Sequence, residues 1–373
     1  MPRFFLLLIF LFPLCAPAQT PPPQVVGRAW LIADISSGQI LASEKPDDRF
    51  EPASLTKVMT AYVVFVALRE KKLTLEQQVN VSEKAWRAPG SRMFIEPRKP
   101  VTADELIRGM IVQSGNDACI ALAEQIAGSE EAFVGMMNRE AERLGMKNTK
   151  FMNVSGLPDP QHYSTARDIY LLASALIRDF PEQYAQYYSM REFRYNGITQ
   201  MNRNRLLWLD STVDGMKTGF TDAAGYCLVA SSKRGPRRLL SVLLGSTSES
   251  MRAQESQKLL NWGFQSFDAM KLYAGGATVK EIEVWKGAKS SLKAGFRSDL
   301  VVAVPKGQGD RLKADMLSLS PLVAPVAEGA RVGNLRVTLD GKPLGEYPVV
   351  ALEPVDAAGL FGRAWDTLRL WLK

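Results

Sequence analysis

Three short motifs place hydroxyl, amine and amide side chains in a pattern that suits acyl transfer. They are, in chain order, Ser54-Leu55-Thr56-Lys57, Ser114-Gly115-Asn116 and Lys217-Thr218-Gly219. A serine hydroxyl attacks a carbonyl carbon once a base removes its proton, and a lysine three residues further on can be that base. A single S-x-x-K match has little weight, because serine and lysine are common. The ordered combination of all three motifs predicts covalent catalysis on a serine.

The sequence around Ser54 predicts a helix that positions the first motif. Apolar residues lie almost all round the helical turns from Leu55 to Leu68, which indicates a buried helix beginning at about Ser54. Ser54 and Lys57 then share one face, and the helix N-terminus offers N–H groups to an oxyanion. A second match, Ser290 to Lys293, has no partner motifs and is expected to be a solvated loop or strand edge.

Composition requires the general base to be a lysine. His162 is the single histidine, and it lies between two prolines and Tyr163 in a segment typical of a surface loop. One histidine and three scattered cysteines show no metal-ligand spacing, so we expect no metal and no cofactor. A lysine that acts near pH 7 needs its pKa lowered by roughly 3 units, about 4 kcal/mol. Burial of Lys57 and a neighbouring Lys217 would both lower it.

The other two motifs supply polar groups for a substrate. Ser114 could relay a proton to a leaving amine, and the Asn116 amide could hold a substrate carbonyl and the Lys57 chain. The alternative for this motif is a helix cap, because serine and asparagine are favourable before a helix at 117–124. Lys217, Thr218 and Gly219 lie between strand-like residues 213–216 and 226–230. Lys217 and Thr218 there can bind a carboxylate, and Gly219 allows close approach of another backbone.

With these motifs the chain resembles the serine-type D-alanyl-D-alanine carboxypeptidases, which are low-molecular-mass penicillin-binding proteins. The resemblance extends over essentially the whole exported chain. Beyond the three motifs it is carried by residues 163–168, 202–208, 213–219, 223–226 and 258–264.

The resemblance implies a role for each matching residue. Ser54 would be the nucleophile and Lys57 the acylation base. Ser114 and Asn116 would be the proton relay and the substrate clamp. The residues implied in substrate binding are Lys217, Thr218, Gly219, Phe220 and Arg252. Of these, Lys217, Thr218 and Arg252 would bind the terminal carboxylate. The N–H groups of Ser54 and Phe220 would form the oxyanion hole, with Phe220 where some relatives have a histidine.

The implied reaction removes the terminal D-alanine from peptidoglycan stem pentapeptides, and β-lactam antibiotics would acylate the same serine.

A class A β-lactamase shares the motifs but needs a deacylating carboxylate in the loop after the S-x-N helix. Residues 151–168 contain Asp159 and Asp168 but no glutamate. D,D-endopeptidase activity stays open. A non-catalytic wall-binding protein would have no reason to retain Lys57.

The N-terminus has the pattern of a secretory signal. Residues 1–18 contain Arg3, an apolar run too short to span a membrane, and an A-x-A site ending at Ala18. Cys15 is not preceded by the small residues that lipidation requires. We expect a periplasmic protein attached peripherally to the outer face of the inner membrane.

Removal of Arg3 with the signal lowers the net charge from +7 to +6. This positive charge is small and spread along the chain, so it does not indicate nucleic-acid binding. Cys119 and Cys227 are expected as buried thiols.

The exported chain is longer than a typical single domain. Residues 25–271 mix strand and helix signals, and the resemblance implies an α+β transpeptidase-like domain in which an antiparallel sheet packs on a helical cluster. Residues 272–355 contain short strand-like runs and predict a small all-β domain. Residues 356–373 predict an amphipathic helix with Trp365 and Leu368 on its apolar face. That helix is expected to lie on a membrane surface.

Overall fold

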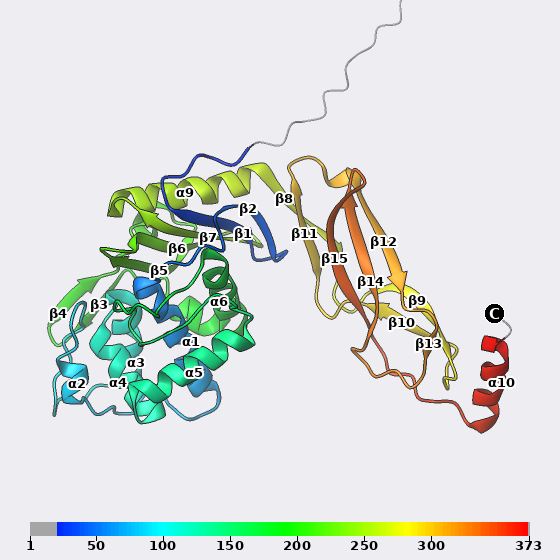
Figure 1. Ribbon diagram of the computed structural model, residues 1–373, viewed down its shortest axis with the longest axis horizontal. Helices are drawn as coiled ribbons and strands as arrows, with labels where there is room; N and C mark the ends of the chain where they lie inside the picture. The colour runs from blue at the N-terminus through cyan, green and yellow to red at the C-terminus, as the bar shows by residue number, and fades with distance from the viewer. Residues whose placement is uncertain (1–20, 372–373) are drawn as a thin grey trace, which may run out of the picture.

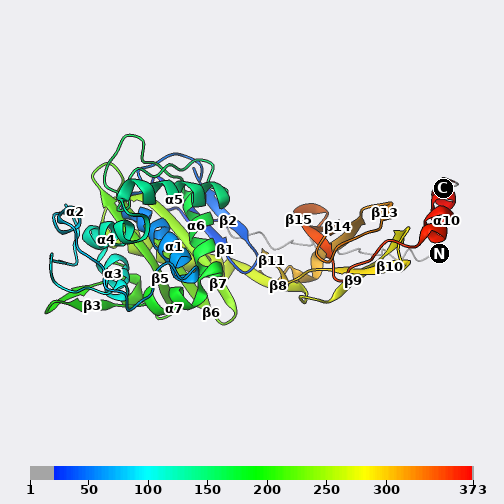
Figure 2. The same ribbon diagram turned by 90° about the horizontal axis from the view of Figure 1, so that it is seen from below.

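The computed structural model describes residues 21–371, so the predicted signal at 1–18 lies outside the described residues. Figures 1 and 2 show a larger α+β body, a smaller β body beside it, and one helix at the far end of the smaller body. Within the described residues, no helix is long and apolar enough to cross a membrane.

The larger body is built on a five-stranded antiparallel sheet in the order β2-β1-β7-β6-β5. Alternate residues of β1 enter different cores: Leu31 and Ala33 face one, and Trp30 and Ile32 face the other. The sheet is therefore covered on both faces. Its strands are β1 (Ala29–Asp34), β2 (Gln39–Glu44), β5 (Val213–Thr221), β6 (Gly225–Arg234) and β7 (Arg237–Ser246).

Helices cover the two faces of this sheet. Helix α9 (Glu249–Ser266) packs along β7 and β6 on one face, and a helical cluster packs on the other. A small hairpin, β3 (Glu192–Tyr195) and β4 (Ile198–Met201), flanks the cluster. The cluster contains α1 (Thr56–Arg69), α2 (Glu83–Trp86), α3 (Ala103–Arg108), a π-helical turn (Gly109–Gln113), α4 (Asn116–Ala127), α5 (Glu130–Arg143), α6 (Ala166–Asp179) and α7 (Pro181–Tyr187). The short helix α8 (Leu206–Leu209) lies on the other face, where Leu206 and Leu207 join the core beneath α9.

Helix α1 runs through the middle of the larger body and is buried almost all round, as its sequence predicts. It begins at Thr56, slightly later than expected. Ser54 lies in a preceding 3₁₀ turn (Ala53–Leu55). A hydrogen bond of 3.0 Å from Leu55 N to Pro52 O stabilises this turn. Cys119 and Cys227 are free and buried, as expected.

The smaller body is all-β. Its larger sheet has the order β12-β14-β15-β10-β9-β13, and β8 pairs with β11. The boundary expected at 271 falls inside β8, because α9 passes into this strand with no intervening turn. The strands are β8 (Phe267–Tyr273), β9 (Thr278–Trp285), β10 (Ser291–Gly295), β11 (Leu300–Pro305), β12 (Leu312–Ser318), β13 (Leu322–Val323), β14 (Arg331–Leu339) and β15 (Lys342–Ala351), with a 3₁₀ turn at Gly309–Arg311 and the terminal helix α10 at Leu360–Trp371.

Candidate active site

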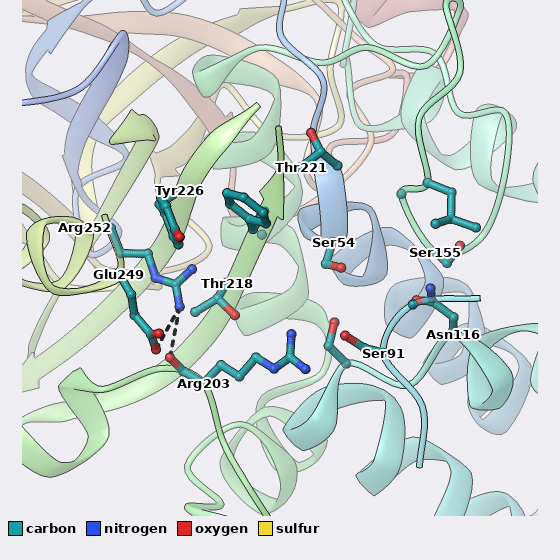
Figure 3. Close-up of a pocket in the computed structure, with 16 residues that line it drawn as sticks. Ser54, Ser91, Asn116, Ser155, Arg203, Thr218, Thr221, Tyr226, Glu249 and Arg252 are labelled. Atoms are coloured by element: carbon teal, nitrogen blue, oxygen red, sulfur yellow. Dashed lines mark hydrogen bonds and ion pairs between the residues drawn. The ribbon is translucent and has the colours of Figure 1, made fainter. Parts of the chain in front are cut away.

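A cavity of about 400 Å³ lies between strand β5 and the helical cluster (Figure 3). Most of the predicted site residues line it, although they come from distant parts of the chain. The predicted residues in its wall are Ser54, Ser114, Asn116, Thr218, Gly219, Phe220 and Arg252. Lys57 and Lys217 do not line the cavity and lie buried behind its wall.

Lys57 contacts Ser54 directly. Its Nζ lies 3.0 Å from Ser54 Oγ and donates to the carbonyl oxygen of Ser155 at 2.6 Å. The side chain is only 1% exposed, and this burial lowers the pKa of Lys57 to about 8. The charge of Arg203 lowers this pKa further, whereas Cys119 and Asp117 raise it. About one molecule in ten would then hold Lys57 as a neutral amine at pH 7.

Two glycines allow backbone segments to approach the Ser54 turn. A Cβ on Gly156 would lie 1.8 Å from Ala53 O, and a Cβ on Gly219 would lie 3.3 Å from Leu55 N. Gly156 also has φ +84°, which other residues rarely adopt. The turn is therefore held between strand β5 and the loop that carries Ser155.

Ser114 and Asn116 direct unused polar atoms into the cavity wall. Neither side chain caps α4, whose N-cap is Gly115 without a side-chain bond, so the helix-cap alternative is wrong. Among the described residues, Ser114 Oγ and Asn116 Oδ1 are buried and have no hydrogen-bond partner. Asn116 Nδ2 donates to Pro89 O at 2.7 Å, and Ser114 has φ +67°, an uncommon value for a serine. Such buried, unpaired polar atoms suit a substrate site.

Cationic side chains gather at the β5 end of the cavity. Lys217 Nζ donates to Thr218 O at 3.0 Å, and burial together with the charges of Lys57, Arg203 and Arg252 holds the pKa of Lys217 well below its usual value. Arg252 lies in the wall and contacts Arg203 O and Glu249 (Figure 3). Burial also lowers the pKa of Arg252.

Sequence reasoning missed Arg203, whose side chain extends through the cavity towards Ser91 (Figure 3). The motif around it, residues 202–208, was recognised, but nothing local distinguished Arg203 from Arg205. The prediction for His162 was wrong. This histidine is 3% exposed, and its ring lies within hydrogen-bonding distance of Thr56 at the start of α1.

The loop carboxylates lie outside the cavity. Among residues 21–371, Glu249 on α9 is the only acidic residue that lines it, while Asp159 and Asp168 do not. Asp168 instead accepts hydrogen bonds from Asn148 N and Thr149 Oγ1. No cluster of three or more potential metal ligands occurs within residues 21–371.

Solved structures similar to this chain include penicillin-binding proteins. Penicillin-binding protein 5 from Haemophilus influenzae matches with a TM-score of 0.85 at 41% identity, covering 90% of this chain and 99% of its own. Penicillin-binding protein D2 from Listeria monocytogenes, in its ampicillin-bound form, matches with a TM-score of 0.60 at 30% identity. That match covers 66% of this chain and 100% of that protein's chain. The predicted fold class, a transpeptidase-like α+β domain followed by an all-β domain, is confirmed.

Sequence comparison defines the family. The family model of the D-alanyl-D-alanine carboxypeptidases, peptidase family S11, matches residues 16–248. The family model of the C-terminal domain of penicillin-binding protein 5 matches residues 267–357. DacC of Escherichia coli (strain K12), a D-alanyl-D-alanine carboxypeptidase, is 46% identical over 352 residues, 92% of this chain and 88% of its own. DacA of Haemophilus influenzae is 43% identical, covering 94% and 91%. The chain belongs to the D-alanyl-D-alanine carboxypeptidase family.

Proposed function

We propose that this protein removes the terminal D-alanine from peptidoglycan stem pentapeptides through an acyl-enzyme on Ser54, and that β-lactams acylate the same serine. The contact between Lys57 Nζ and Ser54 Oγ carries the proposal, because it joins a lysine whose pKa is lowered to a cavity-lining hydroxyl. The ampicillin-bound form of the Listeria monocytogenes relative supports the β-lactam part.

In acylation, neutral Lys57 takes the proton of Ser54 as Oγ attacks the carbonyl carbon of the D-Ala–D-Ala amide. The N–H groups of Ser54 and Phe220 bind the resulting oxyanion. Ser114 Oγ donates its proton to the leaving nitrogen and takes up the proton that Lys57 holds, the C–N bond breaks, and D-alanine departs. The Asn116 amide has a second N–H beyond the one given to Pro89, and this N–H binds a substrate carbonyl.

The cationic end of the cavity selects a substrate that ends in a carboxylate. Thr218, Gly219 and Arg252 face it directly, and Lys217 lies behind Thr218. Water then hydrolyses the acyl ester and frees Ser54. No carboxylate of the 151–168 loop lines the cavity to speed this step, which disfavours a class A β-lactamase.

Ser54→Ala tests the assignment, and Ser290→Ala is the matched control because Ser290 begins the second S-x-x-K match and is exposed. Both variants are incubated with a fluorescent penicillin and, separately, with a stem pentapeptide. We expect Ser54→Ala to lose labelling and D-alanine release, and Ser290→Ala to keep both. Labelling of Ser54→Ala at another residue contradicts the proposal. Rapid release of the label from wild type indicates a lactamase, absence of labelling indicates a binding protein, and cleavage of cross-linked dimers adds endopeptidase activity.

We also propose that the protein is exported, periplasmic and attached to the outer face of the inner membrane through α10. The polar side of this helix is turned towards the all-β domain. Asp366 accepts from Lys286 N at 2.7 Å, and the Arg369 guanidinium lies 5.3 Å from the centre of the Trp285 ring. The large apolar side chains of the helix are exposed, as an interfacial helix requires. They are Leu360, Phe361, Trp365, Leu368 and Trp371.

A further inference from the structure

His162 is a buried titratable group that the reaction above does not use. It closes the loop at 151–163, whose ends are held together where Lys150 and Tyr163 exchange backbone hydrogen bonds. Its ring packs edge-on against Phe151, and His162 Nε2 lies 2.9 Å from Thr56 Oγ1. Thr56 belongs to the first motif, between Ser54 and Lys57. The loop thus meets the catalytic motif through a contact that no proposed step requires.

The hydrogen bonds determine the form of the ring. Met152 N can only donate, so His162 Nδ1, which it contacts at 3.4 Å, must accept. In a neutral ring Nε2 then carries the proton and donates to Thr56 Oγ1. Burial lowers the pKa of His162 to about 4, although the nearby Asp159 charge raises it, so this form persists above pH 5. His162 therefore acts as a fixed donor.

The same loop holds Lys57. Thr56 and Thr60 lie one turn apart on α1 and both contact the loop, since Thr60 Oγ1 donates to Val154 O at 2.6 Å. Between them, Lys57 Nζ donates to Ser155 O. Asn153 shapes the loop tip by accepting from the N–H groups of residues 155–157. Loss of the His162–Thr56 hydrogen bond would therefore let the loop move, and with it the Ser155 carbonyl that orients the Lys57 amine.

We propose that His162 is a positioning residue for acylation. Its contact with Thr56 holds the 151–163 loop in place, and the Ser155 carbonyl of that loop orients the Lys57 amine towards Ser54. This inference rests on Lys57 acting as the base proposed above. The Ser155 carbonyl accepts a hydrogen bond from one N–H of the Lys57 amine, which orients the amine so that the lone pair of its neutral form can face the Ser54 hydroxyl. The loop also keeps water from Lys57.

Two isosteric substitutions separate the bonds of His162 in the full-length protein. His162→Gln keeps an N–H near the Nε2 position and can still bond to Thr56, whereas His162→Asn keeps only an acceptor near Nδ1 for Met152. Thr56→Val and Thr56→Ser form the matched pair on the other side, because only serine retains the hydroxyl. Acylation by a reporter penicillin is followed by stopped flow from pH 6 to 10, at several penicillin concentrations, with thermal unfolding measured for every variant.

We expect His162→Asn and Thr56→Val to slow maximal acylation by roughly 10–100-fold while non-covalent penicillin binding changes little. Their acylation midpoint should move upward from about pH 8, because water reaches Lys57. The groups facing Lys57, namely Cys119, Arg203, Asp117 and Lys217, stay unchanged in all variants. His162→Gln and Thr56→Ser should retain most of the rate, and the double variant His162→Asn/Thr56→Val should be no slower than either single one.

Two results would overturn the inference. In one, His162→Asn acylates like wild type. In the other, the Asn and Gln variants lose rate equally, in step with thermal stability, and the pH midpoint stays in place, which would make His162 a packing residue. If either His162 variant does not fold, the Thr56 pair decides. Failure of the proposed function has a different signature, because Lys57→Ala would then acylate normally.

Discussion

Gly156 packs against Ala53 so closely that a Cβ on residue 156 would lie 1.8 Å from the Ala53 carbonyl oxygen. Ala53 directly precedes Ser54, and Ser155, which binds Lys57, directly precedes Gly156. One close backbone contact therefore connects the segment that carries the nucleophile to the segment that orients the base. The geometry of the pair depends on a residue that has no side chain.

Gly156→Ala should disrupt this contact. Its Cβ would meet backbone atoms, which cannot move aside as a flexible side chain can, and alanine disfavours φ +84°. We expect acylation to fall by about 100-fold or more and the free energy of unfolding to fall by about 1–3 kcal/mol. Penicillin acylation kinetics and urea denaturation measure the two effects.

Gly128→Ala is the control for the backbone term. Gly128 ends α4 with φ +79°, and nothing lies within 4 Å of the Cβ that would be added. This variant should lose about 1 kcal/mol of stability, because alanine disfavours a positive φ, and no acylation rate. Equal effects of the two substitutions on acylation would show that the contact with Ala53 has no role in catalysis.

Burial of the Lys57 amine should appear in the pH dependence of stability. Its pKa is lowered to about 8 in the folded protein, against roughly 10.4 in an unfolded chain. Between these pH values the unfolded state binds one more proton, so the stability of wild type rises with pH relative to Lys57→Met. We expect the difference to move in favour of wild type by up to about 3 kcal/mol from pH 8 to 10.5 and to stay constant below pH 7. Urea titrations at each pH measure it, and a constant difference throughout would contradict a lowered pKa.

Recognition of the terminal carboxylate should depend on Arg252 and Lys217. A charge-assisted contact contributes about 1.5–3 kcal/mol, so Arg252→Gln should reduce kcat/KM for a free-acid peptide by roughly 10–150-fold more than for its C-terminal amide. Lys217→Gln should show the same preference. Lys271→Gln, which removes a charge from the exposed pair with Asp299, is the control. Equal losses on both substrates after Lys217→Gln would mean that Lys217 does not bind the terminal carboxylate.

Local sequence predicted the parts of the site that depend on local geometry. The spacing of Ser54 and Lys57 places them on one face of adjoining helical turns, and the structure brings their polar atoms to 3.0 Å. Gly219 was expected to allow close backbone approach, and it does so against Leu55. The buried helix α1 followed from a continuous apolar run. In each case a few neighbouring residues determine the result.

Contacts between distant segments could not be predicted in this way. The carbonyl that binds Lys57 belongs to Ser155, 98 positions away, and a backbone carbonyl has no residue-type signature. The sequence around His162 is typical of a surface loop, and its hydrogen-bond partner Thr56, 106 positions away, cannot be identified from that local sequence. Arg203 lines the cavity, and helix α8, which follows it closely in the chain, packs beside β5. The tertiary fold, rather than any motif, brings these groups to the site.

Helix α10 should anchor the enzyme without contributing to the reaction. Trp365 and Trp371 are 63% and 85% exposed, and burying each large apolar side chain in a lipid interface contributes about 1.5–3 kcal/mol. Deleting residues 356–373 should release the protein from anionic vesicles in a sedimentation assay and leave D-alanine release from a small peptide unchanged. The cavity and α10 belong to different bodies, so no catalytic contact is removed.

A single charge placed on either side of α10 tests its orientation. Trp365→Asp puts a carboxylate on the apolar face and should weaken vesicle binding by 10-fold or more, because a buried Trp side chain is lost and a charge is placed at the lipid. Thr367→Asp adds the same charge at an exposed position outside that face and should weaken binding only slightly, through reduced attraction to anionic lipid. If both substitutions weaken binding equally, charge rather than apolar insertion attaches the helix. If the truncated protein still sediments with vesicles, the membrane contact lies elsewhere on the molecule.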